Sequence, residues 1–265
     1  MKAGLPIGVF DSGLGGLTVL DELRRALPRE DFVYLGDVAR LPYGSKSGEV
    51  VQKYAQRCID YLLRQPVKAV VVACNTATAV ALEMLRALSP VPVYGVIGAG
   101  ARAGADATRN GKVLVLATES TVKSEAYLRA FHRIGKAVQV EQMACPLLVP
   151  LAESGWFDHP VTREVIRTYL TQASDTDYDT VVLGCTHYPL LVPSFRGFFG
   201  NEVRLVHSGE ALASEVKEEL KKLSLLREEG TRGKILFHTT DKVSSHGPIV
   251  RSLFGHTVEF DLVDL

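Results

Sequence analysis

Cysteine is scarce in this chain of 265 residues, which has four and no Cys-x-x-Cys pair. Their spacing matches no zinc-binding pattern, so the sequence predicts no metal site. So few cysteines also exclude a disulfide-rich fold, and in a reducing compartment all four are expected to be free thiols. Cys58 falls on the apolar face of a predicted helix, and Cys145 stands between Ala144 and Pro146. Both are therefore predicted to be core residues.

Long apolar segments and an excess of charge are absent as well. No stretch is long and apolar enough to span a bilayer, and the N-terminus lacks the cleavage site of a signal peptide. Thirty basic residues balance thirty acidic ones, for a formal net charge of zero. This balance offers no electrostatic basis for nucleic acid or a membrane surface as the main partner. We expect a cytoplasmic protein.

What the chain does contain is two apolar, β-branched runs that each end in a cysteine. Residues 69–73 lead to Cys74-Asn75-Thr76, and residues 180–184 lead to Cys185-Thr186-His187. Such runs are typical of buried parallel strands. In open α/β sheets, ligands bind beyond the carboxyl ends of the strands, so both cysteines are predicted to lie at a ligand site.

The order of the predicted elements is the same in both halves: strand, helix, strand, helix, a strand ending in cysteine, helix, strand. This repeat predicts an α/β fold of two pseudo-symmetric, doubly wound domains with mostly parallel sheets and a cleft between them. A run of small residues at 98–104 marks the expected boundary. We expect residues 1–97 plus 208–265 to form the first domain, with the C-terminal segment packed back on it, and residues 98–207 to form the second.

A glycine-rich loop follows the first predicted strand, residues 7–10. It reads Asp11-Ser12-Gly13-Leu14-Gly15-Gly16 and leads into a helix. Free backbone N–H groups at a helix N-terminus bind anions, although the glycines alone also suit a tight turn. Asp11 and Ser12 are the stronger candidates, because they stand at a strand end.

Two cysteines at equivalent strand ends of two facing domains would place two thiols on opposite sides of one cleft. An ordinary thiol has a pKa of about 8.5, close enough to neutrality for it to act as an acid or as a base. If one thiol removes a proton from a carbon and the other returns a proton to the opposite face, the stereocentre is inverted. The paired cysteines therefore predict an enzyme that inverts a stereocentre.

Polar neighbours can assist this chemistry. Asp11 is expected to reach Cys74, and His187 lies two residues after Cys185, so each can orient a thiol or exchange a proton with it. Groups able to hold a carboxylate or an ammonium come from Ser12, Asn75, Thr76 and Thr186. Supporting positions behind these side chains are assigned to Asp37, Thr118, Thr121 and Glu153.

Five motifs, spread over essentially the whole chain, resemble those of the glutamate racemases. They are residues 11–16 (Asp-Ser-Gly-Leu-Gly-Gly), Pro42-Tyr43-Gly44, residues 73–77 (Ala-Cys-Asn-Thr-Ala), residues 144–147 (Ala-Cys-Pro-Leu) and residues 184–191 (Gly-Cys-Thr-His-Tyr-Pro-Leu-Leu). The two cysteine motifs together with the first loop are highly specific.

The resemblance implies a substrate that residue chemistry alone does not supply. It implies interconversion of L- and D-glutamate for peptidoglycan synthesis, without a cofactor, by an enzyme that is often a homodimer. Cys74 and Cys185 would be the catalytic acid/bases, assisted by Asp11 and His187. The substrate would be bound by Asp11, Ser12, Pro42, Tyr43, Gly44, Asn75, Thr76, Thr186 and His187.

The chain departs from the pattern of many relatives at two places. It has Gly98-Ala99-Gly100 where many have Glu-Pro-Gly, and His207-Ser208-Gly209 where many have Asp-Ser-Gly. These differences leave the cysteine motifs intact and concern the hinge and regulation more than the reaction.

Three other functions stay open from the sequence. A related two-cysteine enzyme would act on aspartate, a hydantoin or maleate. The second is a small-ligand-binding or regulatory protein, including a gyrase inhibitor, and the zero net charge does not exclude a protein partner. A Cys-His hydrolase built on Cys185 and His187 is the third, but it leaves Cys74 unexplained.

Overall fold

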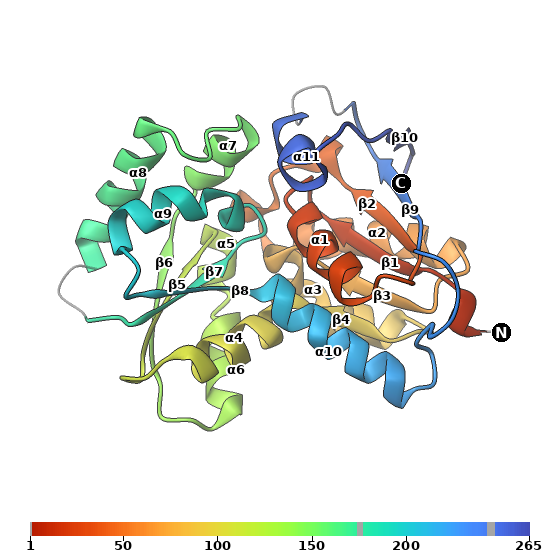
Figure 1. Cartoon of the computed structure of the whole chain (residues 1–265), viewed down its shortest axis with the longest axis horizontal. Coiled ribbons are helices and arrows are strands. Elements are labelled where there is room, and N and C mark those ends of the chain that lie inside the picture. The colour runs from red at the N-terminus through yellow and green to blue at the C-terminus, as the bar shows by residue number, and fades with distance from the viewer. Residues whose placement is uncertain (1, 174–176, 243–246) are drawn as a thin grey trace.

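The computed structural model describes residues 2–173, 177–242 and 247–265. They form two parallel β-sheets, each covered by helices, which lie side by side in Figure 1. The α/β prediction of two parallel-sheet units is confirmed. No helix in these ranges is both long and apolar enough to cross a membrane.

The larger sheet has six strands in the order β10-β9-β2-β1-β3-β4, and every pairing in it is parallel. Its central strands are buried along their whole length, as their apolar sequences require. The strands are β1 (Ile7–Asp11), β2 (Phe32–Gly36), β3 (Ala69–Val72), β4 (Val93–Gly95), β9 (Ile235–Thr239) and β10 (Asp261–Leu262).

The smaller sheet has four parallel strands in the order β6-β5-β7-β8. In both sheets the strand that precedes a candidate cysteine, β3 or β7, is an interior strand beside the first strand of its unit. The strands are β5 (Lys112–Ala117), β6 (Gln139–Ala144), β7 (Thr180–Gly184) and β8 (Arg204–His207).

Eleven α-helices are described, and each follows a strand or lies between two strands. They are α1 (Leu17–Ala26), α2 (Gly48–Arg64), α3 (Asn75–Leu88), α4 (Val96–Ala107), α5 (Glu119–Lys123), α6 (Ala126–Ile134), α7 (Leu148–Glu153), α8 (Pro160–Leu170), α9 (Val192–Phe199), α10 (Ser208–Lys222) and α11 (Gly247–Phe254). Short 3₁₀ turns occupy Lys2–Gly4, Val38–Arg40, Tyr43–Ser45, Thr171–Ala173 and Tyr188–Leu191.

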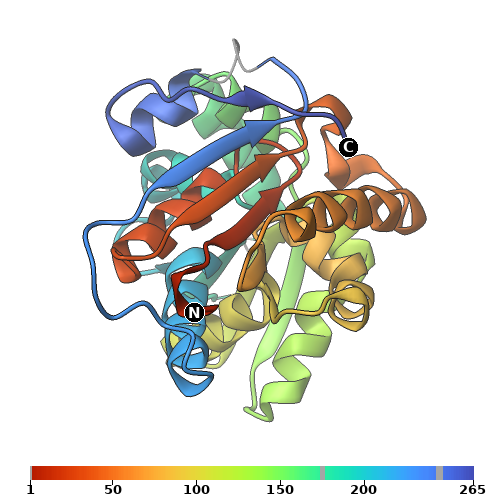
Figure 2. The ribbon, with the colours of Figure 1, turned by 90° about the vertical axis from the view of Figure 1, so that its right-hand side faces the viewer.

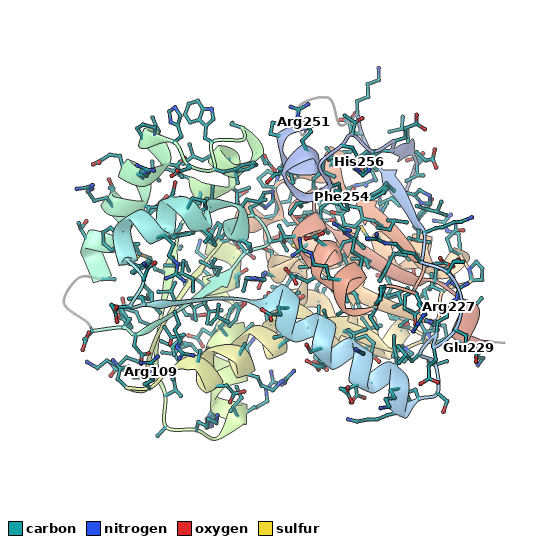
Figure 3. All side chains as sticks on the ribbon, viewed as in Figure 1. Arg109, Arg227, Glu229, Arg251, Phe254 and His256 are labelled. Carbon is teal, nitrogen blue, oxygen red and sulfur yellow. The ribbon has the colours of Figure 1, made fainter. Side chains whose placement is uncertain are left out.

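The C-terminal segment returns to the larger sheet, as expected. Strand β9 pairs with β2 along its whole length, so the blue strands continue the red sheet in Figure 2. The connection from α10 to β9 is held by Arg227, labelled in Figure 3, which pairs with Asp31 at 2.6 Å. The backbone N–H of Arg227 also donates to the Glu30 carboxylate at 2.8 Å. Chain ends far apart in sequence thus build one sheet.

The run of small residues at 98–104 is the middle of helix α4. This helix packs against α10, α6 and strand β7, between the two halves of Figure 1. A Cβ atom at Gly104 would lie 2.7 Å from Val182 Cγ2, and one at Gly100 would lie 3.0 Å from Ser208 Cβ. The glycines therefore allow close helix packing. The division into 1–97 plus 208–265 and 98–207 stays a prediction, and its first boundary falls within the first turn of α4.

Two glycines of α4 make a matched test of this packing. Gly104→Ala is expected to lower the free energy of unfolding by about 1–3 kcal/mol, because the new methyl group would clash with buried side chains. At Gly98 the nearest atom to a new Cβ belongs to the flexible Arg102 side chain, 3.5 Å away. Gly98→Ala is therefore expected to be neutral or stabilising by up to about 1 kcal/mol. Urea unfolding measures both, and equal effects would contradict the packing argument.

Candidate active site

A cavity of about 340 Å³ lies between the carboxyl ends of the two sheets. Residues from both units line it, and both candidate cysteines are among them. The lining consists of Ser12, Leu41, Pro42, Tyr43, Gly44, Ser45, Cys74, Asn75, Thr76, Thr118, Glu119, Pro146, Val149, Pro150, Glu153, Cys185, Thr186 and His187.

Cys74 lies between the end of β3 and the first turn of α3, where it caps the helix. Its sulfur accepts the Ala77 N–H at 3.4 Å, and its thiol is 3.5 Å from the Ser12 hydroxyl oxygen, to which it donates. Burial raises the pKa of this thiol to about 12, and the negative charge of Asp11 adds to the effect. Cys74 therefore carries its proton at neutral pH and is placed to deliver it to a ligand.

Asp11 is the last residue of β1 and is completely buried. Its carboxylate accepts the Gly13 N–H at 3.0 Å and the Thr186 hydroxyl, from the other unit, at 3.4 Å. Burial raises the pKa of this carboxyl, although the charge of His187 opposes the shift. A Cβ at Gly16 would lie 2.4 Å from Asp11 Cβ. The glycine therefore lets the helix start pass close to the carboxylate.

The second thiol has an imidazole beside it. Cys185 follows β7, and its sulfur lies 3.9 Å from His187 Nδ1. The other ring nitrogen, Nε2, lies 3.3 Å from Glu153 Oε1 on helix α7. Burial lowers the pKa of His187, but the Cys185 sulfur and the Glu153 carboxylate outweigh burial and raise it to about 10. At neutral pH the imidazole is therefore a buried cation between a sulfur and a carboxylate.

Hydroxyl groups from both units meet at another wall of the cavity. Thr76 Oγ1 lies 2.9 Å from Thr118 Oγ1, which in turn lies 2.9 Å from Thr121 Oγ1. Thr76 belongs to α3 on the larger sheet, and the other two belong to the start of α5 on the smaller sheet. Such hydroxyls can rotate to donate to a carboxylate.

The loop with Pro42, Tyr43 and Gly44 covers the cavity from the side of the larger sheet. The Tyr43 hydroxyl donates to the buried Asp37 carboxylate at 2.5 Å, and Arg40 and Thr240 donate to its other oxygen. A Cβ at Gly44 would lie only 2.8 Å from Thr118 Cβ. The loop is therefore tied down on its own unit and packed against the other.

The structure brings together nearly all of the residues singled out from the sequence. Three do not line the cavity: Asp11 contacts Thr186 from behind, Asp37 holds the covering loop, and Thr121 bonds to Thr118. Cys58 and Cys145 are buried and do not line the cavity, as core residues should be. Further lining residues, which sequence reasoning did not single out, are Leu41, Ser45, Glu119, Pro146, Val149 and Pro150.

Comparison with known proteins agrees with this geometry. A family model described as Asp/Glu/hydantoin racemase matches residues 7–216. The chain belongs to the Asp/Glu/hydantoin racemase family. A glutamate racemase from Geobacter metallireducens is 49% identical over 89% of this chain and 87% of its own length.

Solved structures of racemases extend the likeness to the fold. A glutamate racemase isoform from Bacillus anthracis superposes with a TM-score of 0.94 at 39% identity, covering 98% of both chains. A glutamate racemase from Francisella tularensis, solved in complex with D-glutamate, gives a TM-score of 0.91 at 31% identity, covering 99% of this chain and 98% of its own. The resemblance to glutamate racemases is confirmed.

The charge of His187 in this racemase makes a prediction about pH. Glu153→Gln removes a carboxylate that raises the imidazole pKa, so that pKa is expected to fall below about 10 while burial continues to lower it. NMR titration of the His187 ring measures the shift. Glu119→Gln is the matched control, because Glu119 also lines the cavity but is not among the groups that shift His187.

The same shift has a consequence for stability. The folded-state pKa of His187 lies above the ordinary value of 6.5, so the charged ring stabilises the fold fully below pH 6.5. This contribution is lost as the pH rises through about 10.

An unchanged His187 titration in Glu153→Gln would refute the role given to the carboxylate.

Proposed function

We propose that this protein is a racemase that interconverts L- and D-glutamate with two thiols as acid and base. The observation that carries the proposal is that Cys74 and Cys185, which end equivalent strands of two separate sheets, line one cavity. Two-base inversion requires an acid and a base on opposite sides of one carbon, and thiols that reach one cavity from two separate sheets support this mechanism.

The chemistry proceeds by one proton leaving and another arriving. In one direction the Cys185 sulfur takes the proton of the α-carbon, and the Cys74 thiol gives its own proton to the opposite face. The C–H bond broken on one face is replaced by a C–H bond on the other, and the two sulfurs exchange protonation states. In the reverse direction the roles are exchanged. The high pKa of Cys74 supports a resting state in which this residue is the acid.

Neighbouring charges assist both thiols. We propose that His187, held as a cation by Glu153, exchanges a proton with Cys185 and stabilises negative charge on its sulfur. Asp11 acts on Cys74 through its charge, while the direct hydrogen-bond partner of that thiol is Ser12. The Cys185–His187 pair alone would suit a hydrolase, but a hydrolase would give Cys74 no role.

Glutamate is the substrate that the relatives favour. Both of its carboxylates need hydrogen-bond donors, and the cavity offers hydroxyl or amide groups on two sides. We propose that the substrate is bound by Pro42, Tyr43 and Gly44 of the covering loop together with Ser12, Asn75, Thr76, Thr118, Thr186 and His187. Aspartate, hydantoins and maleate are the rival substrates. D-Glutamate made here would supply peptidoglycan synthesis, and the cytoplasmic location and the homodimer stay predictions.

Exchange of the α-proton in D₂O tests the proposal. The wild type is expected to invert L- and D-glutamate with deuterium incorporated at the α-carbon, followed by NMR and circular dichroism. Cys74→Ser and Cys185→Ser are each expected to lose about 10²–10⁴-fold in inversion rate, the usual contribution of a positioned acid or base. Cys145→Ala is the control and should keep the rate, because Cys145 is buried outside the cavity.

Either of two results would count against the proposal. If the wild type leaves glutamate untouched, the substrate assignment fails, and aspartate, hydantoins and maleate come next. If one cysteine variant inverts glutamate at the wild-type rate, the two-thiol mechanism fails even though the substrate assignment stands.

A further inference from the structure

The amide of Asn75 is held on one side by a tyrosine of the other unit. Asn75 lines the cavity at the start of α3 and is 2% exposed. Its Oδ1 accepts a hydrogen bond from the Tyr127 hydroxyl at 2.8 Å. Its Nδ2 is buried and has no hydrogen-bond partner among the described residues. A buried donor without a partner is rare and unfavourable, so a ligand in the cavity is its natural acceptor.

Tyr127 is fixed firmly enough to set the orientation of this amide. It lies in the first turn of α6, on the smaller sheet, and is completely buried. A Cβ at Gly184 would lie 3.0 Å from Tyr127 Cε2, and one at Gly100 would lie 3.1 Å from its hydroxyl oxygen. The ring is thus enclosed between Gly184, the last residue of β7, and helix α4.

The direction of the phenol proton follows from the partner of the hydroxyl. Asn75 Oδ1 is an amide oxygen and can only accept, so the Tyr127 hydroxyl donates its proton to it. An amide that accepts through its oxygen on this side must present its NH₂ group elsewhere.

We propose that Tyr127 is a positioning residue that orients the Asn75 amide so that its NH₂ group donates to a carboxylate of the substrate. This inference rests on the proposed function. Asn75 belongs to the unit with Cys74, and Tyr127 belongs to the unit with Cys185. The productive orientation of the amide therefore depends on the two units lying together, which couples carboxylate binding to the apposition of the two thiols.

Tyr127→Phe tests the proposal, since it removes only the hydroxyl. The NH₂ contact acts on a carboxylate that is present throughout the reaction, so its loss weakens substrate and transition state alike. We expect KM for L- and D-glutamate to rise by about tenfold, with kcat changed by less than about threefold. An unchanged KM, or a loss confined to kcat, would overturn the proposal.

Two controls separate positioning from a general loss of stability. Tyr188 is also fully buried, and its hydroxyl donates to the Ala117 and Cys145 carbonyls. Tyr188→Phe should lower Tm as much as Tyr127→Phe and leave KM unchanged. In an Asn75→Ala background, adding Tyr127→Phe should give no further rise in KM, because its effect passes through the amide. A full additive rise would overturn the proposal.

A second variant covers the case in which Tyr127→Phe does not fold. Asn75→Asp keeps the shape of the side chain but replaces its NH₂ group by an oxygen, so it should raise KM for L- and D-glutamate by about tenfold or more. An unchanged KM for Asn75→Asp would then overturn the proposal. Turnover of glutamate by the wild type is measured first, and its absence would refute the proposed function separately from the role of Tyr127.

Discussion

Burial of ionisable groups is the constraint on which this site depends. Both cysteines, Asp11 and His187 are at least nine-tenths buried, in an environment that disfavours unpaired charge. The fold reduces this cost in two ways. On one side it leaves Cys74 as a neutral thiol, whose pKa rises to about 12 through burial first and Asp11 second. On the other side it compensates a charged imidazole with the Glu153 carboxylate and the Cys185 sulfur. Cys74 and Cys185 thus occupy equivalent positions in the two units, but their electrostatic environments differ.

The parallel sheets explain why these groups meet. Each cysteine follows a strand that is buried on both faces, so the polar residues after it emerge only at the carboxyl edge. Glycines then bring the second layer close: Gly16 admits the α1 helix start beside Asp11, and Gly104 admits α4 onto β7. A side chain at either position would separate elements that the site needs in contact. Close backbone packing is therefore part of the electrostatic arrangement.

The sequence was most informative where chemistry follows directly from a strand. The apolar runs before Cys74 and Cys185 predicted two strand ends, and the repeated order of elements predicted two units. What it could not reveal were contacts between distant segments. Tyr127 and Asn75 are 52 residues apart, and Thr240 reaches Asp37 across 203 residues. The small residues at 98–104 are as typical of a closely packed helix as of a domain boundary, because composition does not show which surface a helix contacts.

Contacts across the cavity link its chemistry to its shape. Thr186 donates to Asp11, Thr76 meets Thr118, and Gly44 packs on Thr118, each pair joining one unit to the other. A rotation between the units would change these contacts, and it would also change the separation of the two sulfurs. Thiol geometry, carboxylate donors and the burial that shifts the pKa values therefore depend on a single relative placement. A two-base reaction needs this property, since an acid and a base on opposite faces are useful only while both reach the same carbon.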